Sequence, residues 1–248
     1  MAIVFGTSGD DTLFGTPESD TIFAGEGNNI IDAFSAGKDT IFAGAGDDQI
    51  FVFSGGDTIF AGEGSNLIIA VGRSEGITTI YTGAGDDEFL TGFDTDSIIF
   101  AGEGNNSADL GVGNNTFFAG AGNDAIRLRG GTNLIYAGEG ANTIEIEAGD
   151  NVIYTGSGND FIDSGEGNNT LFLGGGEDVI TLASGSGFNT INNFIVGQTK
   201  LQLTEGLTFA DLTIAQANNA TQISFGTDLL ASLTSIQAGS LTSDSFIA

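Results

Sequence analysis

Loops rich in glycine and ending in aspartate or asparagine recur along the chain, and their side chains offer oxygen atoms at a regular spacing. Between Gly6 and Asp160 these loops read GTSGDD, AGEGNN, AGAGDD, AGEGSN, TGAGDD, AGEGNN, AGAGND, AGEGAN and TGSGND. Loops ending in Asp alternate with loops ending in Asn, and each Asn loop also carries a glutamate: Glu26, Glu63, Glu103 and Glu139. Carboxylate, amide and carbonyl oxygens are the ligands of hard divalent cations. The pattern therefore favours cation binding between neighbouring loops.

The composition excludes several kinds of catalytic site. The 248 residues include no Cys and no His, which removes thiol nucleophiles, zinc sites and imidazole acid–base catalysis. The chain has 33 acidic and 5 basic residues, a net charge of −28, so we expect it to repel nucleic acid and to attract divalent cations. We do not expect an enzyme, because catalytic carboxylates would have to come from the repeated loops themselves.

The loops belong to nine-residue units that run from Phe5 to about Ile191. Examples are FGTSGDDTL, FAGEGNNII, FAGAGDDQI and YAGEGANTI, with insertions near residues 32–39, 72–78 and 184–188. The units resemble the repeats-in-toxin (RTX) family, whose repeat is G-G-x-G-x-D-x-U-x with U a large aliphatic residue. The resemblance implies an all-β fold, a right-handed parallel β-roll with two units per coil. In each unit six residues would turn and bind calcium and three would form a strand, so several Ca²⁺ ions are the implied cofactor.

Because a coil takes two units, alternate loops are expected on opposite edges of the roll. The glycine-rich loops fall on one edge, whereas the other edge carries loops such as GTPESD, VFSGGD and LRGGTN. Calcium is therefore expected on the glycine-rich edge, at Asp11, Asn29, Asp48, Asn66, Asp87, Asn106, Asp124, Asn142, Asp160 and Asp178. Asn in alternate loops departs from the family's all-Asp pattern and leaves the number of ions open. The alternative is an Asn ladder that joins coils by hydrogen bonds without metal.

One large apolar residue in each unit predicts an inward column on each side of the roll. The first of these residues are Leu13, Ile22, Ile31, Ile41, Ile50, Ile59 and Ile68. No single coil can bury its own apolar residues, so stacked coils must share them. Ala108 is the one small residue in this register, and we expect Phe89 and Phe117 to fill the space beside it.

The residue after the inward position should point outward, because neighbours in a strand alternate sides. On one sheet this position is aromatic throughout: Phe23, Phe42, Phe60, Tyr81, Phe100, Phe118, Tyr136, Tyr154 and Phe172. A Thr column is expected beside it, at Thr21, Thr40, Thr58, Thr79, Thr116 and Thr170, broken by Leu134 and Val152. Monomers rarely expose so long an apolar strip, which favours an interaction face. The alternative is that the stacked rings merely stiffen the sheet.

The repeats are expected to occupy residues 1–191, and residues 192–248 to form a small β-rich cap. The latter include TKLQL, LTIAQ and TQISF, with a turn predicted at Asn218–Asn219. They resemble the C-terminal segments of type I secretion substrates, which implies an uncleaved export signal. No basic, apolar leader precedes Phe5 and no stretch is long enough to span a bilayer. Residues 2–4 either leave the first coil open or add a minimal strand to it.

These patterns favour an extracellular or surface-associated structural protein. We expect it to fold on binding calcium outside the cell and to self-associate, as a dimer or a filament, through the aromatic face and the first coil. Two alternatives remain open on the same fold: an ice-binding protein, which would use the Thr column, and a carbohydrate-binding module, which would stack sugars on the rings.

Overall fold

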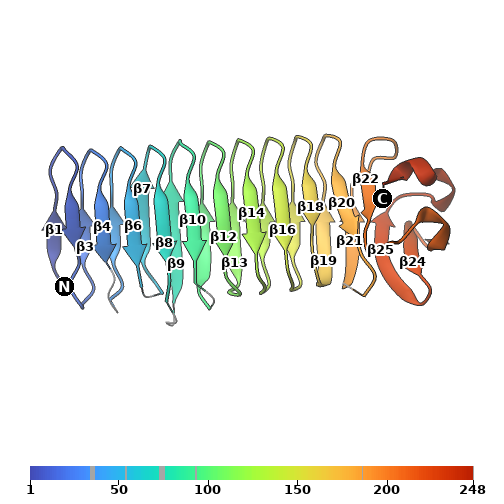
Figure 1. The fold of residues 1–248 in the computed structure, drawn as a ribbon, viewed down its shortest axis with the longest axis horizontal. Coiled ribbons are helices and arrows are strands. Elements are labelled where there is room, and N and C mark those ends of the chain that lie inside the picture. Colours follow the sequence, from blue (N-terminus) through green and yellow to red (C-terminus); the bar gives the residue numbers. More distant parts are fainter. Residues whose placement is uncertain (34–36, 54, 73–75, 93, 186, 248) are drawn as a thin grey trace.

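The chain winds into a long, flat parallel β-solenoid (Figure 1). The computed structural model describes residues 1–33, 37–53, 55–72, 76–92, 94–185 and 187–247. The predicted insertions therefore lie partly outside the described residues. Successive strands alternate between two sheets, so that strands two apart in the sequence lie side by side. This arrangement confirms the predicted all-β roll with two units per coil.

The first sheet has 14 strands, and eleven of them stack in parallel along the roll. These are β1 (Ile3–Phe5), β3 (Thr21–Phe23), β5 (Thr40–Phe42), β7 (Thr58–Gly62), β9 (Ile77–Thr82), β11 (Asp96–Phe100), β13 (Asn115–Phe118), β15 (Leu134–Tyr136), β17 (Val152–Tyr154), β19 (Gly167–Phe172) and β21 (Gly187–Asn192). Residues 3–5 thus form the first strand of this sheet, in register with β3.

The second sheet has 12 strands and runs along the opposite face. They are β2 (Thr12–Phe14), β4 (Ile30–Ala33), β6 (Gln49–Val52), β8 (Leu67–Ala70), β10 (Glu88–Thr91), β12 (Ser107–Leu110), β14 (Ala125–Leu128), β16 (Thr143–Ile146), β18 (Phe161–Asp163), β20 (Val179–Leu182), β22 (Lys200–Leu203) and β26 (Phe246–Ile247).

The core is a thin double column of side chains between the two sheets. The residues predicted to point inward, from Leu13 to Ile68, are buried in the described structure. Each such Ile contributes about 1.5–3 kcal/mol by leaving water. Ala108 pairs in register with Phe89, and the rings of Phe89 and Phe117 meet edge to face with centroids 5.8 Å apart. The predicted filling of the space beside Ala108 is therefore confirmed.

Neighbouring coils approach so closely that some loop positions accept only glycine. Gly44 has φ +107°, and a Cβ atom there would lie 1.7 Å from the carbonyl oxygen of Gly25 in the preceding coil. Any other residue would combine an unfavourable backbone conformation with a backbone clash. The repeated glycines therefore set the spacing of the coils.

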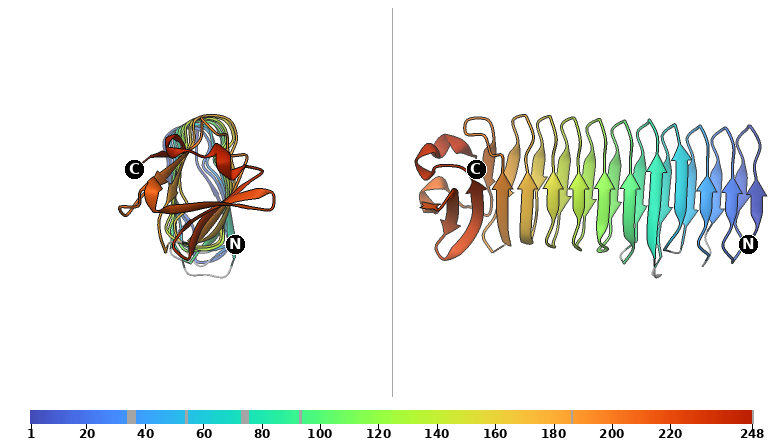
Figure 2. Two further views of the ribbon diagram at one scale, coloured as in Figure 1. Left: turned by 90° about the vertical axis from the view of Figure 1, so that its right-hand side faces the viewer. Right: turned by 180° about the vertical axis from the view of Figure 1, so that it is seen from behind.

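Residues after β22 pack on the last coils, at the end opposite to the N-terminus (Figure 2). β23 (Leu212–Ala217) and β24 (Ala220–Phe225) form an antiparallel hairpin. Its turn is Asn218–Asn219, with Asn218 at φ +54°, as predicted. β25 (Asp228–Thr234) pairs antiparallel with β24 and parallel with β21. The boundary proposed after residue 191 stays a prediction, and β22 extends the second sheet beyond it.

Candidate calcium sites and an outer aromatic strip

The last residue of each glycine-rich loop joins its coil to the coil before it. The backbone N–H of Asn29 donates to Oδ1 of Asp48 at 2.8 Å, and the N–H of Asp48 donates to Oδ1 of Asn66 at 3.0 Å. The same bond recurs from Asp11 to Asp178. From Asn29 onward these residues are at most 2% exposed. The structure thus brings all ten predicted ligand residues into one continuous ladder.

Asp and Asn differ in what the second side-chain atom does. In the Asn loops, Nδ2 donates to the carbonyl of the glycine two residues earlier: Asn29 to Gly27 at 2.9 Å and Asn106 to Gly104 at 3.2 Å. In the Asp loops, Oδ2 takes the place of this donor. An ionised carboxylate can only accept hydrogen bonds. Oδ2 is buried without a hydrogen-bond partner in Asp48, Asp87, Asp124 and Asp160.

Burial shifts the ionisation of these carboxyl groups. Desolvation raises the pKa of Asp48, Asp87 and Asp124, although hydrogen bonds from the preceding Asn partly oppose the shift, as does the nearby hydroxyl of Thr82 for Asp87. The pKa of Asp160 rises to about 6, mainly through desolvation and also through the nearby charge of Asp178. Each of these groups would ionise more readily with a cation beside it.

The Asp loops offer oxygen atoms of the kind that calcium binds. The ion binds six to eight oxygens, from carboxylates, backbone carbonyls and water. The buried Oδ2 atoms, with the glycine carbonyls two residues earlier, would supply part of such a shell. Among the described residues no three acidic side chains form a metal-binding cluster, so carbonyl groups and water would have to complete each site. Asp160 and Asp178 are the only neighbouring rungs of this ladder that are both Asp.

The opposite edge carries a second ladder, which was not predicted from the sequence. The N–H of Asp20 donates to Oδ1 of Asp39, and the N–H of Asp39 to Oδ1 of Asp57. Further along, Asn115, Asn133, Asn151 and Asn169 make the same bonds and also join side chain to side chain. The sequence contains a signal for this ladder, because an Asp or Asn recurs at the start of these strands, as in DTI, NTF, NLI, NVI and NTL. The expectation that calcium prefers the glycine-rich edge stays a prediction.

A more exposed ladder runs outside the glycine-rich edge in the reverse direction. Here the later coil donates to the earlier one: the N–H of Asn28 to Oδ1 of Asp10 at 2.8 Å, and the N–H of Asp47 to Oδ1 of Asn28 at 2.7 Å. Asp47 and Asp48 are adjacent in sequence, but Asp47 is exposed and accepts an N–H of the following coil, whereas Asp48 is buried and accepts one of the preceding coil.

A family comparison agrees with this arrangement. The sequence model of the RTX calcium-binding nonapeptide repeat, in four copies, matches residues 5–33, 35–68, 74–98, 91–126, 109–144, 128–162 and 146–180. The chain belongs to this family. A search of curated proteins found no sequence that matches this chain. The RTX resemblance is thus confirmed, and the repeats are of a calcium-binding kind.

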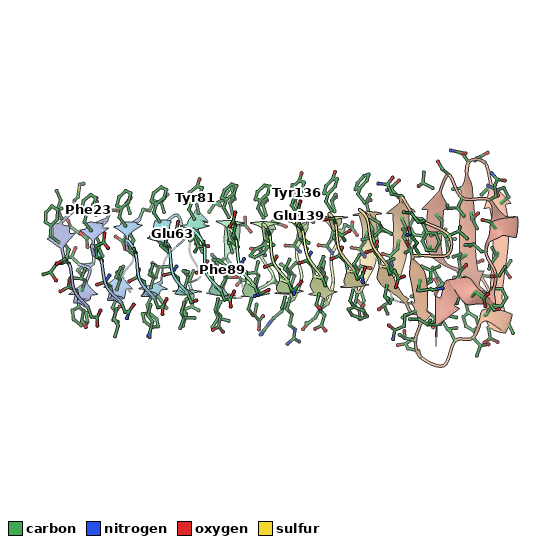
Figure 3. The ribbon with its side chains drawn as sticks, turned by 90° about the horizontal axis from the view of Figure 1, so that it is seen from above. Phe23, Glu63, Tyr81, Phe89, Tyr136 and Glu139 are labelled. Atoms are coloured by element: carbon green, nitrogen blue, oxygen red, sulfur yellow. The ribbon has the colours of Figure 1, made fainter. Side chains whose placement is uncertain are left out.

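The outward aromatic residues of this RTX protein form one continuous stack along the first sheet. Phe23, Tyr81 and Tyr136 project from the same outer face (Figure 3). Phe5, which the sequence analysis left out, extends the nine predicted rings to ten; it is 70% exposed. Neighbouring centroids are 4.6–5.5 Å apart and the ring planes differ by 1–13°. We call these ten rings the aromatic strip.

The Thr column beside the strip is shorter than predicted. Leu134 and Val152 interrupt it as expected, and Ile98 is a third interruption because it pairs in register with Thr79 and Thr116. The longest uninterrupted run is Thr21, Thr40, Thr58 and Thr79. Ile98 was not predicted as an interruption because the strand around it contains two adjacent Ile residues, Ile98 and Ile99.

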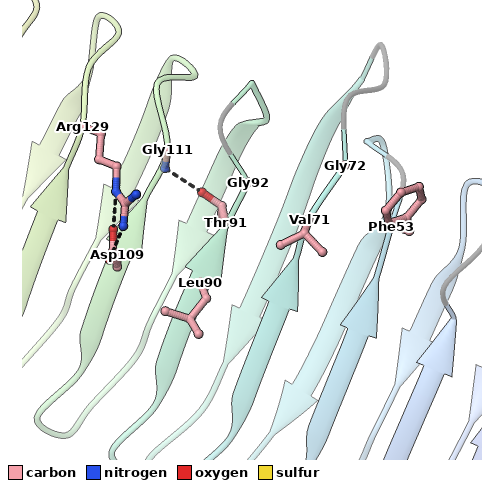
Figure 4. Close-up of a pocket in the computed structure, with 9 residues that line it drawn as sticks. All are labelled: Phe53, Val71, Gly72, Leu90, Thr91, Gly92, Asp109, Gly111 and Arg129. Atoms are coloured by element: carbon pink, nitrogen blue, oxygen red, sulfur yellow. Dashed lines mark hydrogen bonds and ion pairs between the residues drawn. The ribbon is translucent and has the colours of Figure 1, made fainter.

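A hollow of about 560 Å³ lies on the second sheet (Figure 4). Phe53, Val71 and Leu90 give it an apolar lining, and Asp109 and Arg129 form an ion pair at 2.8 Å on its other side. This lining offers apolar contact more than acid–base chemistry. In the described part of the chain, no helix is long and apolar enough to cross a membrane. The expectation that the protein is not an enzyme stays a prediction.

Proposed function

We propose that this RTX protein is exported by type I secretion, folds on binding calcium outside the cell, and self-associates through the aromatic strip. The observation that carries the proposal is the strip itself. Ten stacked rings run along one face, and Phe23, Phe42, Phe60 and Tyr81 remain 36–39% exposed. Soluble monomers rarely leave a continuous apolar surface of this length in contact with water.

A second copy of the chain fits the strip better than a sugar or ice. Sugars stack on ring faces, but here neighbouring rings cover one another's faces and present their edges outward. A regular Thr array of the kind that suits ice is interrupted at Ile98, Leu134 and Val152. Two strips can instead lie face to face, related by a two-fold axis, and such a dimer closes on itself. End-to-end contact, which would give filaments, stays a prediction.

Calcium would control this association through charge. The net charge of −28 opposes contact between copies. Calcium bound in the loops lowers this charge and, at the same time, stabilises the fold that aligns the rings. Assembly is therefore expected only where calcium is abundant, which agrees with a role outside the cell.

The test compares two faces of the same roll. Replacing Phe42, Phe60 and Phe118 with Ser removes part of the strip but keeps the inward residues. The matched control replaces Phe14, Phe51 and Ile69, outward apolar residues of the second sheet, with Ser. In calcium, light scattering and sedimentation should show the wild type and the control as dimers or larger species, and the strip variant as a monomer. A monomeric wild type at high concentration would exclude self-association.

Export is tested separately. Residues 192–248 are proposed to act as the signal for type I secretion. Fused to the C-terminus of a reporter, they should direct it into the medium of cells that contain a type I exporter, whereas residues 146–191 should not. Retention of both fusions would contradict this part of the proposal.

A further inference from the structure

The two kinds of loop on the glycine-rich edge differ in the second side-chain atom of their last residue, which is a nitrogen in Asn and an oxygen in Asp. Each loop has a glycine carbonyl two residues before its last Asp or Asn. In the Asn loops an amide nitrogen donates to this carbonyl, as in Asn29 to Gly27, Asn66 to Gly64 and Asn142 to Gly140. The amide therefore occupies the interior of the loop.

The Asn amide also bridges to the following coil. Nδ2 of Asn29 lies 3.4 Å from the carbonyl oxygen of Ala43, and Nδ2 of Asn106 lies 3.3 Å from that of Ala119. Nδ2 of Asn66 donates to Oδ1 of Asp87 at 3.0 Å. One amide group thus contacts oxygens of its own loop and of the next, as an ion between two coils would do.

In the Asp loops the same place holds an oxygen instead of a donor. Asp48, Asp87, Asp124 and Asp160 each bury Oδ2 without a hydrogen-bond partner, and these residues are at most 2% exposed. A buried carboxylate oxygen without a partner is unfavourable unless a cation lies beside it. The two terminal Asp residues differ: Oδ2 of Asp11 accepts the hydroxyl of Thr7 at 2.8 Å, and Asp178 adjoins the site of Asp160.

We propose that, on the glycine-rich edge, calcium binds only at the four loops of Asp48, Asp87, Asp124 and Asp160, and that the Asn loops bind no metal because their own amide groups fill the site. The glycine-rich edge would then alternate ion-filled and amide-filled loops. This inference rests on calcium binding by the repeats and departs from one ion at every gap between loops. The amide-filled loops would hold half of the edge together before calcium arrives.

Native mass spectrometry of the full chain titrated with calcium tests the count. The wild type should bind four ions tightly. Asp48→Asn should bind three, because its new amide can donate to the carbonyl of Gly46, whereas Asn66→Asp should bind five. Asp47→Asn is the matched control: it makes the same change of charge at the exposed neighbouring residue, so it should still bind four.

Stability gives a second readout that does not depend on bound metal. In chelator, with enough sodium sulfate to keep the chain folded, Asp48→Asn should raise the melting temperature by about 2–4 °C, because an unpaired buried oxygen becomes a hydrogen-bonded amide. Asp47→Asn, at its exposed position, should raise it by less. In calcium, Asp48→Asn should instead lie below the wild type, since it has lost one ion.

The outcomes separate this inference from the function it rests on. About nine ions in the wild type, or four in Asp48→Asn, would overturn the amide-filled loops and leave calcium binding intact. A melting temperature of Asp48→Asn that falls in chelator would also overturn the inference. If no ion binds, the inference and the calcium-dependent function both fail.

Discussion

At the scale of single residues, one atom decides what a loop can do. Asn and Asp have the same shape, and both accept the N–H of the preceding coil through Oδ1. They differ only in the second atom, which donates in Asn29 and is an unpaired oxygen in Asp48. The alternation of the two residues was visible in the sequence, but its consequence was not, because it depends on which carbonyl each side chain faces.

The buried carboxyl groups predict an unusual pH dependence for the calcium-free protein. The pKa of Asp160 is raised from 3.8 to about 6 in the folded chain. Between these values the folded chain holds more protons than the unfolded chain, so the fold gains stability as the pH falls from 7 through 6 toward 4. The penalty is fully present above pH 6 and amounts to about 2–3 kcal/mol for Asp160.

Urea unfolding in chelator and sodium sulfate, at pH 7, 6 and 5, measures this effect. The control is Asp160→Asn, which cannot titrate and should therefore show a flatter profile. A general loss of negative charge at low pH acts on both proteins alike, so their difference isolates the carboxyl group. A wild type that loses stability steadily from pH 7 to pH 5 would contradict the prediction.

Glycine gives a second prediction at this scale. Gly120 has φ +98°, and a Cβ there would lie 1.7 Å from the carbonyl oxygen of Gly102. Gly120→Ala should therefore destabilise the roll by at least about 2 kcal/mol. Gly175 lies in a loop of the same edge, with nothing within 4 Å of its Cβ position, so Gly175→Ala should change the melting temperature little. Equal effects of the two substitutions would show that coil spacing is not set by glycine.

At the scale of strands, the nine-residue period made most of the roll predictable. Each unit contains one inward aliphatic residue and an outward neighbour, so the register of Ile22 with Ile41 and of Phe23 with Phe42 follows from the sequence. The exceptions were positions where periodicity is ambiguous. Ile98 was missed beside Ile99, and Phe5 was assigned only to the start of the repeats. The parallel pairing of β25 with β21 was not predictable, because no repeat precedes β25.

The core around Ala108 provides a test of packing between strands. Phe89 pairs in register with Ala108 and its ring contacts Phe117. Phe89→Ala should cost about 3–5 kcal/mol through the cavity it leaves. Ala108→Leu alone should cost about 1–3 kcal/mol by overfilling the core. Because the two changes compensate in volume, the double variant should be more stable than the sum of the single losses predicts, as measured by a double-mutant cycle in calcium. Strict additivity would place the two residues in separate parts of the core.

At the scale of the whole molecule, repulsion between negative charges opposes the stacking of the repeated coils. A chain with a net charge of −28 repels itself when compact, and each coil is stable only when stacked on its neighbours. Without calcium, two effects destabilise the folded chain: the acidic loops repel one another, and unpaired carboxylates are buried. With calcium, one ion removes both penalties at a given loop. The aromatic strip follows from the same stacking, since every added coil extends the strip by one ring.

Calcium-coupled folding is the prediction that follows at this scale. At 100 times its dissociation constant, one calcium adds about 2.7 kcal/mol. Four sites would together add about 11 kcal/mol, comparable with the whole stability of a typical domain, about 5–15 kcal/mol. Circular dichroism in chelator should therefore show a largely unfolded chain, and millimolar calcium should restore the β signal. Magnesium at the same concentration should not, because it demands a smaller, octahedral shell and keeps its water.

Two controls separate specific binding from simple screening of charge. Sodium chloride at about 1 M screens the acidic loops but fills no site, so it should contract the chain in X-ray scattering without restoring the full β signal. A variant that combines Asp48→Asn, Asp87→Asn, Asp124→Asn and Asp160→Asn should fold in chelator, because amide groups now fill these four loops and four negative charges are gone. If the wild type shows the same β signal in chelator as in calcium, the ladders alone hold the roll together, and the buried Asp oxygens cost less than their lack of partners implies.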